Sequence, residues 1–170
     1  YMPENVIAHS GEAYHEAAWL SLRGGRTDVR CLYRTWSPED VFVKKKYGVY
    51  ADVQSMYPYI QMNKMLPVGK PKRQHREYNR GDFGIVKCSL RRPETFKTHP
   101  AICISDPGTG RLIAPLHDLD DVTICTIELE AALDQGYTLK RVEFVDIYEQ
   151  SDQLFKDYIR AFLKVKVENS

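Results

Sequence analysis

An acidic residue followed closely by a helix-starting serine is the strongest chemical feature of the sequence. Asp52 lies at the end of residues 41–53, whose Val, Tyr and Phe content predicts a β-strand. Ser55 opens a loosely helical run that extends to residue 65. A carboxylate at a strand end can hold a divalent cation, and the N–H groups of a helix start can bind phosphate. The pair therefore predicts either a site for a metal-bound triphosphate or a simple capped turn.

The elements that would position this site are mixed in type. Helices are predicted over residues 12–20, over residues 126–134, and after a cap at Ser151 or Asp152, with Thr126 capping the second. Runs rich in Val, Tyr and Phe predict strands over residues 29–34 and 41–53. Short runs between Pro, Gly and Asp predict strands over residues 84–90, 101–104, 111–114 and 122–125, and a further strand is predicted over residues 137–148. Because these elements interleave without strict βαβ order, the α+β class is favoured.

The charges are balanced overall but unevenly distributed. The chain has 24 Lys+Arg and 23 Asp+Glu, yet residues 70–92 hold eight basic residues against two acids. This basic stretch predicts either a phosphate-facing surface or a solvated loop. Residues 118–134, by contrast, hold six acids and no Lys or Arg.

Composition excludes several classes of protein. A chain of 170 residues is long enough for one domain with an appendage. No apolar run approaches the roughly 20 residues that cross a bilayer, so no membrane partner is expected. The four cysteines form no C-x-x-C pair and the first residues lack a signal-peptide pattern, which favours free thiols and an intracellular protein, in nucleus or cytoplasm. Trp19 and Trp36 are expected to be packing residues.

Four segments resemble one family. Residues 52–58, D-V-Q-S-M-Y-P, resemble the first catalytic motif of family B DNA polymerases, and residues 66–71, L-P-V-G-K-P, are similar to the run that follows it in the protein-primed branch. Residues 23–27, R-G-G-R-T, resemble the Gly-Gly element that links exonuclease and polymerase regions, although Leu22 stands where the family has an aromatic. Residues 154–159, L-F-K-D-Y-I, resemble the segment that re-enters the polymerase core. The amino-acid sequence of the first motif is similar to the one found in polymerases of Polinton/Maverick transposons and related large DNA viruses.

The resemblance implies a role for each residue of the first motif. Asp52 would be a catalytic carboxylate that binds Mg²⁺ or Mn²⁺, with the main-chain carbonyl of Val53 in the same shell. Ser55 and Met56 would offer donors to the triphosphate of a dNTP. Tyr57 would lie under the deoxyribose and exclude a ribonucleotide by its bulk. The implied reaction is attack of a primer hydroxyl on the α-phosphorus, and in this branch the first hydroxyl belongs to a terminal protein.

The resemblance also implies an organisation and partners. Residues 1–67 would be linker and palm, residues 68–150 an inserted small α+β subdomain, and residues 151–170 a helix that returns to palm and fingers. The palm portion would be antiparallel sheet with helices. The insertion would contact the terminal protein and the template-primer duplex. The residues expected to contact DNA are Arg23, Gly24, Gly25, Arg26, Lys72, Arg73 and Arg76.

Two other readings of the sequence stay open. The family's fingers motif and its second metal-binding acidic turn do not occur in the 170 residues, so the isolated chain is expected to be inactive and to be part of a longer polymerase. One alternative is a non-catalytic module that binds DNA or a terminal protein. The other is a Mg²⁺-dependent nuclease that combines Asp52 with Asp146 or Glu143, which requires those acids to lie close together.

Overall fold

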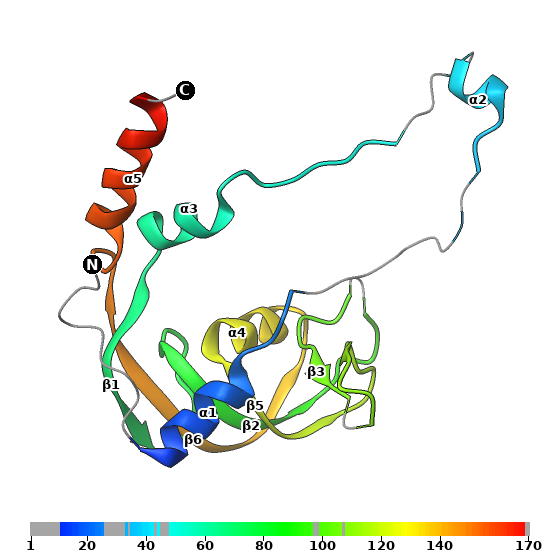
Figure 1. The fold of residues 1–170 in the computed structure, drawn as a ribbon. Helices are drawn as coiled ribbons and strands as arrows, with labels where there is room; N and C mark the ends of the chain where they lie inside the picture. Colours follow the sequence, from blue (N-terminus) through cyan, green and yellow to red (C-terminus); the bar gives the residue numbers. More distant parts are fainter. Residues whose placement is uncertain are drawn as a thin grey trace.

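A four-stranded antiparallel sheet forms the centre of the computed structural model, which describes residues 11–25, 33, 35–42, 44, 48–96, 99–106 and 108–168. The helices are α1 (Glu12–Ser21), α2 (Pro38–Phe42), α3 (Met56–Asn63), α4 (Thr126–Asp134) and α5 (Lys156–Glu168). The strands are β1 (Leu66–Gln74), β2 (Gly84–Arg91), β3 (Ile104–Ser105), β4 (Leu112–Ile113), β5 (Leu119–Cys125) and β6 (Thr138–Ser151). The predicted α+β class is confirmed (Figure 1).

The strand order of the main sheet is β1-β6-β2-β5, and β3 pairs with β4 in a separate two-stranded sheet. The register pairs Pro67 with Gln150, so the two expected boundaries of the inserted subdomain are cross-strand neighbours. The division of the chain at these points stays a prediction. Strand β1 was not predicted, because Pro67, Gly69 and Pro71 interrupt the strand pattern. An edge strand tolerates proline, since its outer N–H groups have no strand to bond.

Helices α1 and α4 cover opposite faces of the sheet. Along β2, Ile85 packs in the cluster that contains Ala17 of α1, whereas Val86 packs in the cluster that contains Leu129 of α4. Successive strand residues point to opposite faces, so this alternation places one helix on each side. The larger core lies on the α4 side, and its fully buried members include Val86, Leu90, Ile102, Ile124, Leu129 and Val145.

The ends of two elements differ from the predictions. Helix α4 has the predicted bounds, but its N-cap is Cys125, whose N–H donates to Glu128 Oε2 at 3.1 Å. The hydroxyl of Thr126 instead accepts a hydrogen bond from the N–H of Gly84 at 3.0 Å, which ties α4 to β2. Helix α5 begins at Lys156, later than the predicted cap at Ser151 or Asp152, because β6 continues to Ser151.

Helices α3 and α5 lie side by side at the end of the β1–β6 pair, away from the core (Figure 1). Helix α3 leads into β1, and α5 follows β6, so the two long strands carry both helices. Several apolar side chains of this helix pair are exposed, namely Met56, Ile60, Tyr158 and Phe162. In the part of the chain that the structure describes, every helix is too short or too polar to span a lipid bilayer.

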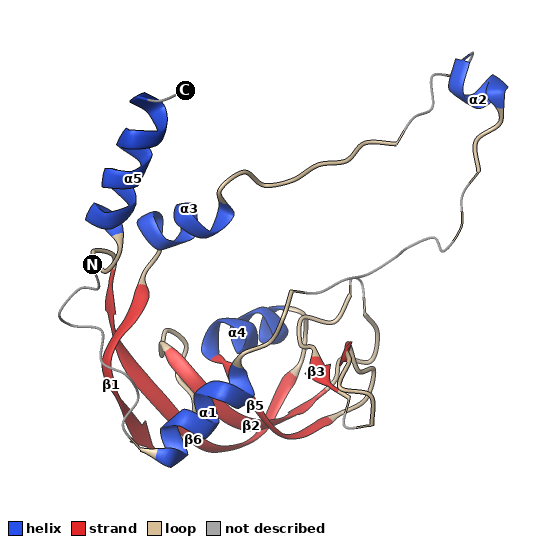
Figure 2. Cartoon of the chain, in the orientation of Figure 1, coloured by secondary structure: helices blue, strands red, loops and turns tan. Residues whose placement is uncertain are grey.

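The predicted strand over residues 41–53 is wrong. Helix α2 includes residues 41 and 42, and residues 48–53 form a loop without strand pairing (Figure 2). A strand requires a neighbouring strand for its hydrogen bonds, and all four strands of the main sheet lie within residues 66–151. The strand-forming side chains are consequently exposed, with Tyr50 at 95%. The predicted strand over residues 29–34 falls, apart from Tyr33, outside the described residues.

Candidate functional site

Asp52 is exposed in the loop that leads into α3. The backbone turns into the helix at Ser55, whose φ of 53° and ψ of 37° are left-handed. Its carbonyl accepts the helical hydrogen bond from the N–H of Tyr59 at 2.9 Å. The Ser55 hydroxyl makes no capping hydrogen bond, so the N–H groups of Met56 and Tyr57 at the helix start have no side-chain cap. The predicted capped turn is therefore not formed, and uncapped donors lie next to the exposed acid.

Tyr57 is a surface residue. Its side chain is 74% exposed, and the neighbouring Met56 and Val53 are exposed as well. A tyrosine with this exposure contributes little to a core, so packing does not explain its presence beside Asp52. The ring is accessible to a ligand held at the start of α3.

The oxygen donors at this loop fit a divalent cation in kind. The carboxylate of Asp52 and the carbonyl of Val53 are the hard ligands that Mg²⁺ and Mn²⁺ prefer. Mg²⁺ takes six ligands in near-octahedral geometry, and the described residues contain no group of three or more His, Cys, Asp or Glu able to hold a metal ion. The loop can thus supply part of a coordination shell, and further oxygens must come from another carboxylate, substrate or water.

The two acids that a nuclease would add are already engaged. Asp146 is 1% exposed, and Arg73 donates to both of its oxygens, from Nε at 2.8 Å and Nη2 at 2.7 Å. Glu143 pairs with Lys87 at 2.9 Å. Neither carboxylate is free to bind a metal together with Asp52. The nuclease reading therefore has no geometric support.

Arg73, one of the predicted DNA-binding residues, is a structural residue in this fold. Its guanidinium lies 3.7 Å from the centroid of the Phe144 ring and 5.0 Å from that of Tyr14, and Nη2 also approaches the carbonyl of Ala13 at 3.4 Å. The hydrogen bonds with buried Asp146 raise the pKa of Arg73 above its usual value. The side chain therefore joins β1, β6 and the first turn of α1, and its charge is neutralised within the protein.

Arg76 is paired with an acid, as Arg73 is, whereas Lys72 is not. Arg76 donates to both oxygens of Asp82, at 2.8 and 2.9 Å, and this hydrogen bonding lowers the pKa of Asp82. Lys72 is exposed and has no carboxylate partner among the described residues. Of the three predicted phosphate contacts in this stretch, Lys72 alone keeps an unpaired charge.

The predicted Gly-Gly element begins with an arginine that points into the protein. Arg23 is 11% exposed; its Nη2 donates to the carbonyl of Thr123 at 2.8 Å, and its Nη1 lies 3.5 Å from Glu128 Oε2. These contacts fasten the chain to β5 and α4, so the geometry gives no support to a phosphate contact. Gly24 and Gly25 are exposed, and a Cβ added to either meets no atom within 4 Å. Arg26 lies outside the described residues.

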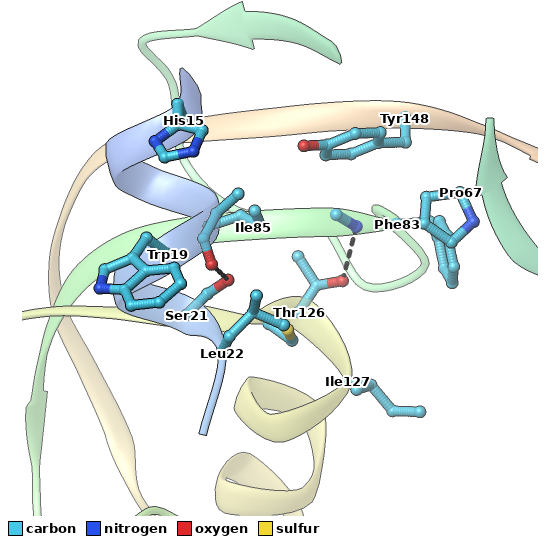
Figure 3. A pocket seen from close by; sticks show the side chains of 13 residues that line it. His15, Trp19, Ser21, Leu22, Pro67, Phe83, Ile85, Thr126, Ile127 and Tyr148 are labelled. Atoms are coloured by element: carbon cyan, nitrogen blue, oxygen red, sulfur yellow. Dashed lines mark hydrogen bonds between the residues drawn. The ribbon is translucent and has the colours of Figure 1, made fainter. Parts of the chain in front are cut away.

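Trp19 is a surface residue that sequence analysis took for a packing residue. Its side chain is 72% exposed on the last turn of α1. It lines two hollows, of about 390 and about 500 Å³, and Leu22 lines both as well. Figure 3 shows the first hollow, with Trp19 and Leu22 near α1 and Phe83, Pro67 and Tyr148 farther along its wall. Among the sequence signals, only the position of Trp19 just before the Gly-Gly element pointed to this surface.

Comparison with known proteins identifies the family. Residues 2–170 match the family model described as DNA polymerase type B, organellar and viral. No match was found among curated proteins. An orthorhombic crystal form of Phi29 DNA polymerase is similar, with a TM-score of 0.51 and 22% identity over 69% of this chain and 22% of that chain. Phi29 DNA polymerase in a ternary complex with primer-template DNA and incoming nucleotide is also similar, with a TM-score of 0.50 and 23% identity over 68% of this chain and 22% of that chain. The chain thus spans about a fifth of these polymerases, and its fold and family match agree: it belongs to the type B DNA polymerases of organelles and viruses.

Proposed function

We propose that this chain is part of a protein-primed DNA polymerase and that it carries one catalytic carboxylate, Asp52, together with an inserted subdomain. The observation that supports this proposal best is the arrangement at the start of α3, where an exposed acid adjoins uncapped backbone N–H groups. Because residues 2–170 match a family of DNA polymerases, we interpret this arrangement as part of a polymerase active site.

Each residue of the loop would have a separate role in binding a dNTP. The carboxylate of Asp52 and the carbonyl of Val53 would hold a divalent cation, Mg²⁺ or Mn²⁺, which when bound neutralises phosphate charge and favours ionisation of the primer hydroxyl. The N–H groups of Met56 and Tyr57 at the helix start are suited to phosphate oxygens, which they would orient before reaction. The exposed ring of Tyr57 would form the floor of the sugar site and exclude a 2′-hydroxyl. A second carboxylate from elsewhere in the complete polymerase would finish the shell.

The inserted subdomain would bind the template-primer duplex and the terminal protein. Lys72 is a candidate for a phosphate contact on β1, because its ammonium group is exposed and unpaired among the described residues, and the same holds for Lys70 on this strand. Gly24 and Gly25 would let a DNA strand approach the backbone closely, since no side chain intervenes. Arg73 would act indirectly, by holding β1 against β6, and Arg76 by fixing the connection between β1 and β2 through Asp82.

The test is the replacement of Asp52 by asparagine in the complete polymerase of which this chain would be a part. The change removes the charge that holds the cation and keeps the size of an exposed side chain, so the fold should be unaffected. Primer-extension activity should fall by at least about a hundredfold, while gel-shift affinity for template-primer DNA stays within about twofold. Near-normal incorporation by Asp52→Asn would show that the acid is not catalytic.

A further inference from the structure

We propose that residues 69–71, Gly-Lys-Pro, form a bent joint in β1 that sets the position of the loop before α3 relative to the four-stranded sheet. Gly69 is then a positioning residue for the reaction at Asp52. This inference rests on the proposed function, because it concerns how the proposed catalytic acid is placed. The joint lies within residues 66–71, the run that is similar to one found after the first motif in the protein-primed branch.

The register of β1 against β6 changes within these three residues. Val68 is paired with Glu149, whereas the next paired residue of β1, Lys72, lies opposite Ile147. Three residues of β1 therefore face a single residue of β6, Tyr148, which is two more than a regular antiparallel ladder contains. A bulge of this kind bends its strand and increases the local twist.

The backbone of the bulge has a defined conformation. Gly69 has a φ of +70°, which glycine adopts without a steric cost. Pro71 is buried, its ring fixes its own φ, and it has no N–H to donate to β6. A Cβ on Gly69 would meet nothing within 4 Å, so glycine is required at this position by the backbone angle and not by packing.

The two sides of the bulge differ in how firmly they are held. On the inner side, Arg73 and Asp146 are register partners and form an ion pair at 2.7 Å, and β6 also pairs with β2. The pairing with β2 ends at Ile147, so in the described part of the chain residues 149–151 pair with residues 66–68 alone. The bend therefore separates an anchored sheet from a two-stranded ribbon.

The ribbon carries the proposed catalytic loop. Only residues 64–65 separate α3 from β1, and residues 152–155 separate β6 from α5, where Lys156 pairs with Asp152 at 2.9 Å. Helices α3 and α5 contact each other at the end of the ribbon (Figure 1). A change of angle at the bulge would therefore move α3, and with it the loop of Asp52, relative to the sheet. Displacements of about 1 Å can cost about a hundredfold in rate.

The first experiment compares two glycines of matched geometry in the complete polymerase of which this chain would be a part. Gly110, between β3 and β4, has a φ of +67° and open space around it, as Gly69 has. Valine disfavours this angle, so Gly69→Val and Gly110→Val should lower thermal stability similarly. Only Gly69→Val should slow primer extension, by about tenfold or more at saturating template-primer and dNTP. Gly69→Asn tolerates a left-handed φ and should keep activity within about threefold.

The second experiment removes the bend. Deleting Gly69 and Lys70 leaves one residue of β1 opposite Tyr148 and restores a regular ladder. Pulsed electron paramagnetic resonance in the 170-residue chain would measure the distance between spin labels on non-canonical residues at position 127 of α4 and position 160 of α5. The deletion should change this distance by several Å and should slow primer extension as Gly69→Val does. Lys70→Ala keeps the chain length and should leave the distance unchanged.

The outcomes separate this inference from the proposed function. If Gly69→Val and Gly110→Val slow primer extension equally, the loss reflects stability alone and the inference is wrong. If the deletion changes the distance while extension stays normal, the bend does not position the site, and the inference is again wrong. If Asp52→Asn incorporates dNTPs normally, the proposed function fails, whereas the distance measurement still decides whether the bulge orients α3 and α5.

Discussion

Replacing Arg73 by methionine should destabilise the fold strongly. Asp146 is 1% exposed, and both of its oxygens accept hydrogen bonds from this guanidinium. Removing one partner of a buried pair leaves the other charge without compensation, which costs about 3–5 kcal/mol. Methionine preserves much of the side-chain volume against Phe144 and Tyr14, so the loss would report the unpaired carboxylate more than a cavity. Urea denaturation followed by circular dichroism measures the change in the free energy of unfolding.

The matched control is Arg76→Met. Arg76 makes the same two-point contact, with Asp82, a few residues farther along the chain, but its side chain and that of Asp82 are both more exposed than Asp146. Water can solvate Asp82 after the change, so the loss of stability should be clearly smaller. The double variant Arg73→Met, Asp146→Leu should recover much of the loss, because no buried charge is left unpaired. Equal losses for Arg73→Met and Arg76→Met would refute the argument from burial.

Two further changes test the packing and the electrostatics of the sheet. Gly84→Ala should lower the free energy of unfolding by about 3 kcal/mol or more in the same denaturation assay, because φ is +158° and a Cβ would lie 1.9 Å from the carbonyl oxygen of Asp146. Gly25→Ala is the control: it has open space around it and should change stability by less than about 0.5 kcal/mol. Similar losses for the two variants would contradict the close approach at Gly84. The hydrogen bonds from Arg76 hold the pKa of Asp82 in the folded protein below its usual value. The contribution of Asp82 to folding stability is therefore fully present above the pKa of the unfolded chain, near pH 4, and is lost as pH falls through the lower pKa of the folded state. The stability difference between the unsubstituted chain and Asp82→Asn should therefore shrink below about pH 4, and a constant difference from pH 7 to pH 2 would show that this ion pair is not involved.

Local signals predicted much of the fold. Helix α4 has the bounds expected for residues 126–134, because Leu129 and Ala132 recur at helical spacing and Gly136 follows with a positive φ. Strands β2 and β6 were predicted from apolar and β-branched residues that lie in the core of the sheet. In these segments the residues that favour an element locally are also the ones buried by it.

The segment that carries Asp52 shows where local signals fail. Val49, Tyr50 and Val53 favour a strand, yet residues 48–53 have no strand beside them among the described residues. Strand propensity expresses how well side chains fit a paired, half-buried surface, and without the pairing it has no effect. The converse holds for β1, whose prolines and glycine argue against a strand, while β6 supplies the hydrogen bonds that form one.

Side-chain partners were the least predictable feature, and the basic stretch over residues 70–92 shows why. Arg73, Arg76, Arg80 and Lys87 pair with acids that lie between 6 and 73 positions away in the sequence. The side chains of Lys70, Lys72, Arg91 and Arg92 form no ion pair among the described residues, although the backbone N–H of Arg92 donates to Asp118 Oδ1 at 3.0 Å. Counterion release depends on charges that can reach phosphate, so half of the eight cations counted in the sequence are poor candidates for DNA contact. Any contribution of this stretch to DNA binding is therefore expected from the unpaired four, which include Lys72 on β1 and Arg91 at the end of β2.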